Sequence, residues 1–513
     1  MSNNNATDDT GAIRSGVAGR VGNYRWVICA LLFFCTTINY VDRNSLSVLK
    51  TTLQGALGWN DVDYAWITFA FTFAYAAFPS PIGVFVDRFG VKKALAIALI
   101  LWSFAAAGHG LVATVIGFII MRFILGVAEA ANFPASIKAV AMWFPQKERA
   151  LATGIFNSGT SVGVMVSWGT VAISNAFGWQ AAFVCIGAIG LIWLYFWQVY
   201  FDAPESSKRV RTPELEYIRG GQPPAEKSLK VPWTLLLRYR DIWPFLIGKL
   251  ITDPVWWFYL FWLPSYLENE RDQPPLGASI WIAVIYLGST IGSVLGGWLS
   301  SSLIKRGWPV GKARMTAMFI AAACMPASVF AYYADSLEAC VAFIALATGA
   351  HQAWSANLFT SATDLFPQKV SGSVVGLGAT AGGIGGMFMT LLVGLIVQWT
   401  GNQQLVFIWA GAMHLASLGL FWWWFHGRFT QVDVDAGLDT SRTNYALTIG
   451  GALVAAGGAL LGVFVMNRWD FIVSIVKFNG ALGAATVAGG FVVIGLALIY
   501  AGLPRRNQVV APN

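Results

Sequence analysis

Charged residues inside apolar stretches are the residues of this sequence best placed to do chemistry. Asp42 and Arg43 interrupt the first such stretch, and Arg122 and Glu129 lie seven residues apart in the fourth. A charge at the centre of a bilayer costs about 2.5 to 3.5 kcal/mol, so it needs a functional reason to be there. A guanidinium group grips a carboxylate through two parallel hydrogen bonds. These residues therefore predict a buried site for an organic anion, with Arg43 as its anchor.

Two of these residues, Asp42 and Glu129, are candidates for carrying protons. Burial favours the neutral form of a carboxyl group, whereas a nearby arginine favours the charged form, so an arriving anion can shift the balance. Static ion pairing is the alternative: residues seven apart share a helix face, and an internal pair of Arg122 with Glu129 is the simplest state. An Arg43 that pairs only with Asp42 is the alternative to anion binding.

The seventh apolar stretch combines charge with a helix-breaking residue. Lys249, Asp253 and Trp257 follow each other at helical spacing and so share one face. Pro254 removes a backbone hydrogen bond from this helix, which predicts a kink that could serve in gating.

Aromatic and polar side chains in the seventh and tenth stretches are candidates for contact with the substrate. Trp256 and Tyr259 fit either a cavity wall or the aromatic belt at a membrane surface, and both interpretations stay open. The tenth stretch carries a single polar stripe whose hydroxyl and amide groups suit a polyol: Asn357, Thr360, Ser361 and Asp364.

Composition identifies the elements that must position these residues. The 513-residue chain is 56% hydrophobic and only 11% charged, against roughly 25% charged residues in soluble domains. A helix needs about 20 apolar residues to cross a bilayer. Twelve such stretches are predicted: 26–46, 62–85, 91–111, 113–138, 150–173, 180–201, 241–268, 278–303, 313–334, 338–365, 371–398 and 404–426.

The predicted helices divide the chain into two halves and an appendage. Residues 1–201 form an N-terminal six-helix bundle, 202–240 a proline-rich and basic linker, and 241–428 a C-terminal six-helix bundle. Two more apolar stretches between residues 441 and 503 predict an additional membrane hairpin. The sequence thus predicts an all-α membrane protein.

The distribution of basic residues predicts the orientation in the membrane. Lys and Arg gather in alternate loops and in the linker, which is typical of cytoplasmic loops, so both ends of the twelve-helix body are expected in the cytoplasm. The net charge of +8 follows from this topology, and no nucleic-acid partner is expected.

Three pairs of glycines have the spacing that lets membrane helices approach closely. Packing alone and sliding during gating are the two interpretations. The pairs are Gly159 with Gly163, Gly292 with Gly296, and Gly382 with Gly386.

Three motifs carry a resemblance to a known family. Residues 83–93, GVFVDRFGVKK, resemble the signature between helices two and three of the major facilitator superfamily. Residues 39–43, NYVDR, and 122–130, RFILGVAEA, are similar to its anion:cation symporter branch. The resemblance covers about residues 25 to 428 and implies two bundles that rock about a central site.

Two further runs, DPVWWFY at 253–259 and HQAWSANLFT at 351–360, look most like bacterial hexuronate transporters. The resemblance implies that Arg43 holds the substrate carboxylate, that Asp42 and Glu129 carry protons, and that Arg122 exchanges partners. It implies substrate contacts from Tyr40, Tyr75 and Asn357. Further predicted substrate residues are Thr160, Trp256, Tyr259 and Trp354, and the predicted gating residues are Asp87, Arg88 and Pro254. Thr160 stands where some aldonate-transporting members have a glutamine.

The predicted function is proton-coupled import of a hexuronate, glucuronate or galacturonate, across a bacterial cytoplasmic membrane. Another organic anion such as an aldonate, and a membrane sensor that binds the anion without moving it, are the alternatives. Protons are the expected coupling ion, with no other cofactor and no metal. The chain has no reactive constellation typical of an enzyme, and it is expected to work as a monomer in the lipid bilayer.

Overall fold

The computed structural model describes residues 21–59, 61–220, 233–273, 275–400, 402–426 and 428–434. Every regular element within these ranges is a helix, as the sequence predicts for a chain that must satisfy its backbone hydrogen bonds in lipid. The hairpin predicted between residues 441 and 503 lies outside the described residues.

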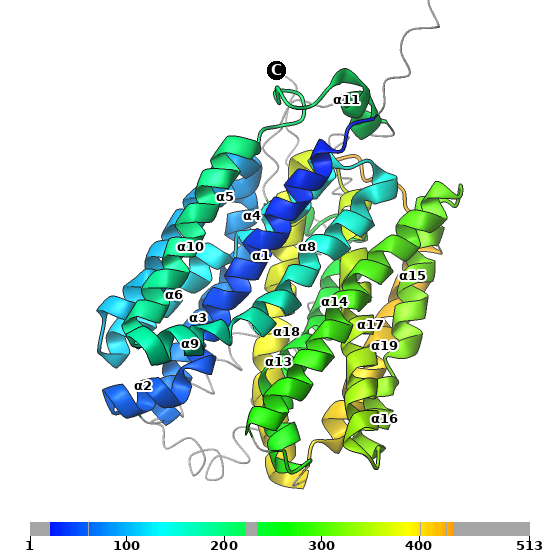
Figure 1. Cartoon of the computed structure of the whole chain (residues 1–513). Coiled ribbons are helices and arrows are strands. Elements are labelled where there is room, and N and C mark those ends of the chain that lie inside the picture. Colours follow the sequence, from blue (N-terminus) through cyan, green and yellow to red (C-terminus); the bar gives the residue numbers. More distant parts are fainter. Residues whose placement is uncertain are drawn as a thin grey trace, which may run out of the picture.

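Helices from the first half of the chain form one bundle, drawn in blue to green on the left of Figure 1. Its long helices run antiparallel to their neighbours, and several are interrupted by a residue or two. They are α1 (Tyr24–Val48), α3 (Asp61–Ala77) with α4 (Pro79–Phe89), α5 (Val91–Gly108), α6 (Val115–Glu129) with α7 (Asn132–Trp143), α8 (Gln146–Val166) with α9 (Gly169–Phe177), and α10 (Trp179–Tyr200).

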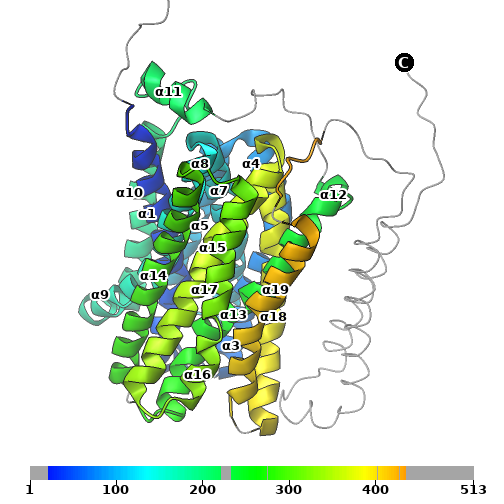
Figure 2. The same cartoon turned by 90° about the vertical axis from the view of Figure 1, so that its right-hand side faces the viewer.

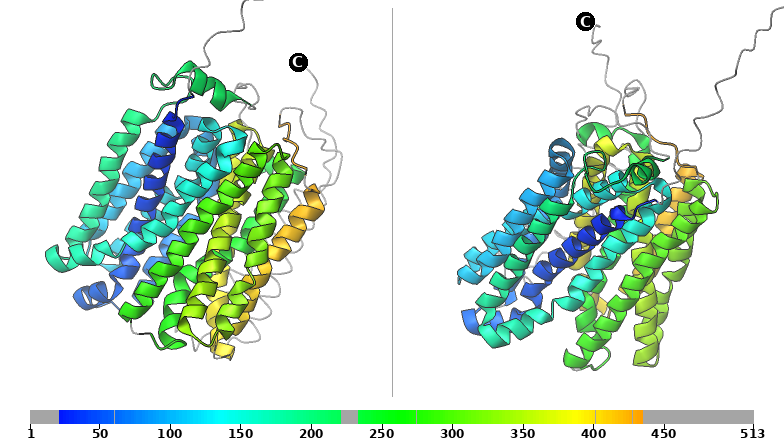
Figure 3. Two further views of the ribbon diagram at one scale, coloured as in Figure 1. Left: turned by 45° about the vertical axis from the view of Figure 1, so that its right-hand side comes forward. Right: turned by 45° about the horizontal axis from the view of Figure 1, so that its top comes forward.

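A second bundle comes from the other half of the chain and stands beside the first, as both views of Figure 3 show. Figure 2 shows it from its outer side. Its helices are α13 (Trp243–Asn269), α14 (Pro275–Lys305), α15 (Val310–Cys324) with α16 (Ala327–Tyr333), α17 (Leu337–Leu365), α18 (Ser371–Thr400) and α19 (Gln404–Phe425).

Short helices mark the two ends of the bundles. Helix α11 (Thr212–Arg219) lies beside the start of α1, and α2 (Lys50–Leu57) lies at the opposite end (Figure 1). We call these the linker end and the α2 end. The linker end is fastened by Arg25 of α1, whose backbone N–H donates to Glu214 of α11 at 3.1 Å and whose side chain donates to Glu148 of α8 at 2.8 Å.

Each of the twelve predicted stretches coincides with one helix or with a pair of helices in close succession. Among the described residues, eight helices are long and apolar enough to cross a membrane, or up to nine if α3 and α4, bent by 51°, count as one span. Helices α8, α13 and α17 are not among them. Many buried residues of α8 and α17 are polar, and α13 contains Lys249, Asp253 and two prolines. Several of those polar residues, Asn157, Thr160 and Gln352 among them, contact each other across the interface between the bundles.

Glycines allow the helices to approach at backbone distance. All three predicted pairs lie in such contacts: a Cβ added at Gly163 would meet the α1 residue Tyr40 at 2.5 Å, and one added at Gly292 would meet the α17 residue Gly349 at 2.2 Å. A Cβ at Gly386 would meet the α13 residue Trp257 at 2.3 Å. The glycines therefore pack helices within each bundle.

Other glycines pack one bundle against the other. A Cβ at Gly297 of α14 would lie 2.1 Å from the carbonyl oxygen of Ala150 on α8, and one at Gly83 of α4 would lie 2.4 Å from that of Gly372 on α18. Both contacts lie on the linker side of the interface. The bundles are therefore closely packed there.

We expect Gly297→Ala to destabilise this packing. Overpacking costs about 1 to 3 kcal/mol, which outweighs the gain of about 1 kcal/mol for replacing a helical glycine by alanine. Gly419→Ala in α19 is the matched control, because a Cβ there meets nothing within 4 Å. Thermal unfolding in detergent should give a lower midpoint for Gly297→Ala than for Gly419→Ala. Equal midpoints would contradict the close contact.

Candidate functional site

A cavity of about 60 Å³ lies between the two bundles. Four predicted substrate residues on three N-terminal helices line it, namely Tyr40, Arg43, Tyr75 and Thr160. The C-terminal bundle contributes charged, aromatic and polar groups, which include Lys249, Asp253, Trp256, Trp257, His351, Gln352 and Ser355.

Arg43 of α1 presents its guanidinium group to this cavity between two aromatic rings. Its Cζ atom lies 4.4 Å from the ring centroid of Tyr40 and 4.2 Å from that of Tyr75. Its Nε and Nη2 atoms donate to Oε2 of Glu129 at 3.2 and 3.1 Å, and Nη2 also donates to Asn39. Arg43 is thus a buried cation held by a carboxylate of its own bundle.

The pairing of Glu129 differs from the predicted one. The sequence favoured an internal pair with Arg122 on the same helix, but Glu129 accepts from Arg43, which lies 86 residues away in the chain. Arg122 instead donates through Nη1 to the backbone carbonyl of Arg43 at 3.2 Å. The same-helix prediction was wrong because α1 and α6 bring a second arginine closer than spacing alone could show.

Several polar groups around this pair are buried without a partner. Among the described residues, both carboxylate oxygens of Asp42, Oε1 of Glu129, and Nε and Nη2 of Arg122 have no hydrogen-bond partner. Such groups are costly to bury unless something binds them. The first and fourth membrane helices therefore hold two carboxyl groups and one guanidinium group with unused bonding capacity.

A strip of amide and hydroxyl groups crosses the cavity from one bundle to the other. Asn157 of α8 donates to Oε1 of Gln352 on α17 at 2.7 Å, and Gln352 donates to the hydroxyl of Thr160 on α8 at 3.2 Å. Together they offer a polyol a row of hydrogen-bonding partners. Asn157 and Gln352 were missed by the sequence reasoning, although both lie at helical spacing from predicted polar residues.

Three predicted substrate residues lie outside the cavity lining. Tyr259 donates to the hydroxyl of Ser328 at 2.7 Å, and Asn357 donates to the carbonyl of Gly296 at 3.0 Å. The ring of Trp354 packs edge-on against His414 at 5.5 Å. In this state all three support the packing of the C-terminal bundle.

Trp256 and Tyr259 were the two predicted substrate residues of the seventh span, and of these only Trp256 lines the cavity. Its ring stacks on that of His351 at 5.7 Å. Pro254 lies inside α13, which continues on both sides of it, and its Cγ atom would lie 2.8 Å from a Cβ added at Gly385 of α18.

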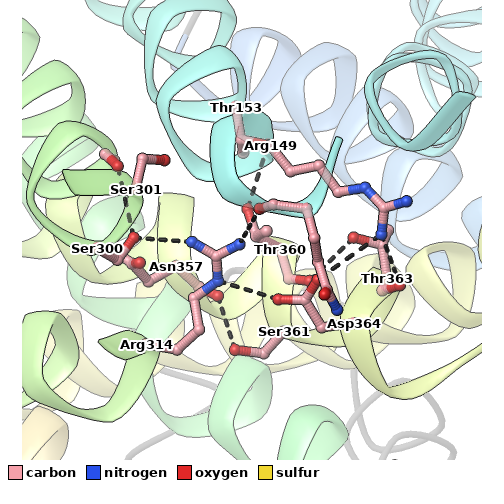
Figure 4. Close-up of polar contacts among 12 residues, drawn as sticks. Arg149, Thr153, Ser300, Ser301, Arg314, Asn357, Thr360, Ser361, Thr363 and Asp364 are labelled. Atoms are coloured by element: carbon pink, nitrogen blue, oxygen red, sulfur yellow. Dashed lines mark hydrogen bonds and ion pairs between the residues drawn. The ribbon is translucent and has the colours of Figure 1, made fainter. Parts of the chain in front are cut away.

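The interface closes on the linker side of the cavity through a buried ion network. Figure 4 shows Asp364 of α17 between two arginines from different bundles. Arg314 of α15 donates to Oδ2 of Asp364 at 3.0 Å and to the Gln146 carbonyl of α8 at 3.0 Å. Nη1 of Arg149 on α8 lies 3.7 Å from Oδ1 of Asp364. One carboxylate thus joins α8, α15 and α17.

Asp87, one of the predicted gating residues, closes the same side at a second place. Its carboxylate accepts from the backbone N–H groups of Gly372 and Ser373, at 3.1 and 2.7 Å. These two residues lie in the first turn of α18, and a carboxylate at a helix N-terminus is stabilised by the helix dipole. Arg88, by contrast, is exposed, with its Cζ atom 5.6 Å from the ring of Phe89.

We expect Asp364→Asn to weaken the closed interface. The change leaves two buried arginines without their carboxylate, which typically costs about 3 to 5 kcal/mol. Asp202→Asn is the control, because Asp202 pairs with Lys92 at 2.8 Å with both side chains at least one third exposed, and such pairs contribute less than about 1 kcal/mol. Tryptophan fluorescence during heating should separate the variants. A loss as small as that of the control would contradict the role of Asp364.

A comparison of the sequence with family models identifies the family of this chain. The model of the Major Facilitator Superfamily matches residues 32–390. The chain belongs to this superfamily. The resemblance seen in the signature motif and in the two six-helix halves is thereby confirmed.

Several relatives are named as transporters of sugar acids. The D-galactonate transporter of Escherichia coli O6:H1 is 30% identical over 77% of this chain and 95% of its own length. The probable galactarate/D-glucarate transporter GudP of Bacillus subtilis is 30% identical over 77% and 91%. The hexuronate transporter of Escherichia coli K12 is 26% identical over 75% and 90%.

Solved structures of the superfamily share the fold. The proton:xylose symporter XylE covers 78% of this chain with a TM-score of 0.63 at 14% sequence identity. As a member of the superfamily, this facilitator is a multi-pass membrane transporter, and the relatives named above are transporters rather than enzymes.

Proposed function

We propose that this facilitator imports a sugar acid anion together with protons by alternating access. The observation that carries the proposal is the position of Arg43: it faces the cavity between the bundles and is held there by Glu129, whose second oxygen has no partner among the described residues. The sugar acid would replace Glu129 on the guanidinium group.

Competition for Arg43 supports the coupling to protons. Nε and Nη2 of Arg43 both donate to Oε2 of Glu129, so a substrate carboxylate that binds these two donors competes with Glu129 for them. Protonation of Glu129 removes its charge and frees Arg43, and an arriving anion in turn favours the protonated form. Asp42, also buried and unpartnered among the described residues, is a second place for a proton.

The closed interface on the linker side supports the proposal that this is the outward-facing state of the transporter. If the linker end faces the cytoplasm, as the distribution of basic residues predicts, the interface is closed inside. A smaller cavity of about 20 Å³ extends from Arg43 and Arg122 to Ser47 near the α2 end. Substrate would reach Arg43 from the outside along this path.

The polar strip of Asn157, Thr160 and Gln352 supports a polyhydroxylated substrate, since it supplies donors and acceptors beside the arginine. The proposed substrates are hexuronates, as the sequence predicts, and related sugar acids. The proposed setting is a bacterial cytoplasmic membrane, with the protein acting as a monomer.

Uptake into liposomes tests the proposal. Purified protein should accumulate radiolabelled glucuronate, galacturonate or galactonate when the outside is acidic, and an uncoupler should abolish the accumulation. Exchange of sugar acid between the two sides without response to the proton gradient would contradict coupling. Binding without any exchange would contradict transport and favour the sensor.

A further inference from the structure

A second buried charge pair lines the cavity from the C-terminal bundle. Nζ of Lys249 lies 2.6 Å from Oδ2 of Asp253, and the side chains are 4% and 18% exposed. Both residues belong to α13 and line the same cavity as Arg43, which comes from the other bundle. The shared face was evident from their spacing, but their position opposite Arg43 was not.

This pair does little for the architecture of the fold. Its partners lie four residues apart on one helix, so their attraction joins no two helices, whereas burying two charges carries a desolvation penalty of several kcal/mol. The surroundings nevertheless make room for it: a Cβ at Gly382 of α18 would lie 2.0 Å from Oδ2 of Asp253. A charge kept at such cost beside a cavity indicates a ligand.

The two bundles present matching arrangements to the cavity. Arg43 is held by a carboxylate of its own bundle and lies against the rings of Tyr40 and Tyr75. Lys249 is likewise held by its own helix and has the ring of Phe359 at 3.9 Å. Each side thus offers one cation that an external anion could take from its internal partner.

We propose that Lys249 is a second anion-binding residue, so that the substrate carries an anionic group at each end of a hydroxylated chain. This inference rests on the proposed function of Arg43. Among the sugar acids proposed above, it places those with two carboxylates ahead of hexuronates, which have one. One carboxylate would bind Arg43 and the other Lys249. The strip of Asn157 and Gln352 would meet the hydroxyl groups between them.

Charge balance distinguishes the two substrate classes. A monoanion can satisfy Arg43 but leaves Lys249 with Asp253, so it gains nothing from the second cation. A dianion takes Arg43 from Glu129 and Lys249 from Asp253, and each displaced carboxylate then takes up a proton. The bound dianion joins the N-terminal and C-terminal bundles. Lys249 therefore favours dicarboxylates over monocarboxylates of equal length.

Gluconate and glucarate provide the test, because they share a six-carbon hydroxylated chain and differ in one terminal carboxylate. In competition binding to the wild-type protein, glucarate should bind about 10 to 100 times more tightly, as expected for one additional charge-assisted contact. Lys249→Gln should remove this preference by weakening glucarate alone, while Lys249→Arg retains it. Lys92→Gln is the control, because Lys92 forms a partly exposed pair with Asp202. It should leave the affinity for both acids unchanged.

Three results would overturn the inference that Lys249 binds a second carboxylate. Equal affinities in the wild-type protein would overturn this inference and leave the proposed function standing, and this measurement needs no variant that must fold. A Lys249→Gln variant that weakens both acids alike would also overturn it, since Lys249 would then support the site as a whole. If neither acid binds the wild-type protein while glucuronate does, the inference fails and the proposed function stands; if glucuronate does not bind either, both fail.

Discussion

Replacement of Arg43 by alanine is expected to abolish sugar acid binding. The two charge-assisted hydrogen bonds that its guanidinium group would give to a carboxylate contribute about 3 to 5 kcal/mol together, which corresponds to a loss of more than about 100-fold in affinity. The change also leaves Glu129, which is fully buried, without its cation. Equilibrium binding of radiolabelled substrate to the purified variant measures the effect.

Arg43→Lys is the control for charge alone. A lysine keeps the positive charge but has no planar fork, and it cannot form the bidentate contact. We therefore expect intermediate affinity, well below that of the wild-type protein. Substrate binding by Arg43→Ala at wild-type affinity would remove the anion anchor from the proposed mechanism.

Replacement of Glu129 by glutamine is expected to separate exchange from accumulation. Glutamine resembles the protonated carboxyl group, so Arg43 stays free for the substrate whether or not a proton is available. Substrate should still exchange between the two sides of the membrane. Accumulation against a concentration gradient should be lost, because this site no longer takes up and releases a proton.

Counterflow and proton-driven uptake in the same liposomes measure the two activities of Glu129→Gln. Glu205→Gln is the matched control, because Glu205 forms an exposed pair with Arg219 outside the bundles. The control should retain both activities. Wild-type accumulation by Glu129→Gln would assign coupling to another group, with Asp42 the next to replace.

Much of the fold follows from the sequence because a bilayer leaves the chain few choices. Apolar stretches of about 20 residues must become helices that bond their own backbones, and the predicted stretches coincide with the helices found. The buried charge of Arg43 was informative for the same reason: a cation in an apolar helix is costly and rarely accidental. Both conclusions depend on local composition alone.

Only the tertiary structure decided which groups meet. Asp42 is next to Arg43 in the chain, but consecutive residues of a helix point about 100° apart, and the arginine pairs with Glu129 of α6 instead. Tyr259 and Asn357 lie on helices that also line the cavity, yet they turn to Ser328 and Gly296.

The sequence by itself determined that the chain forms membrane helices and which of them carry buried charge, because both follow from the transfer of side chains into lipid. It did not determine that Lys249 lies on the same cavity as Arg43, since these residues belong to different bundles. Their meeting depends on how two separately folded bundles pack, through glycine contacts and the Asp364 network. Such contacts join residues far apart in the chain, and no local pattern encodes them.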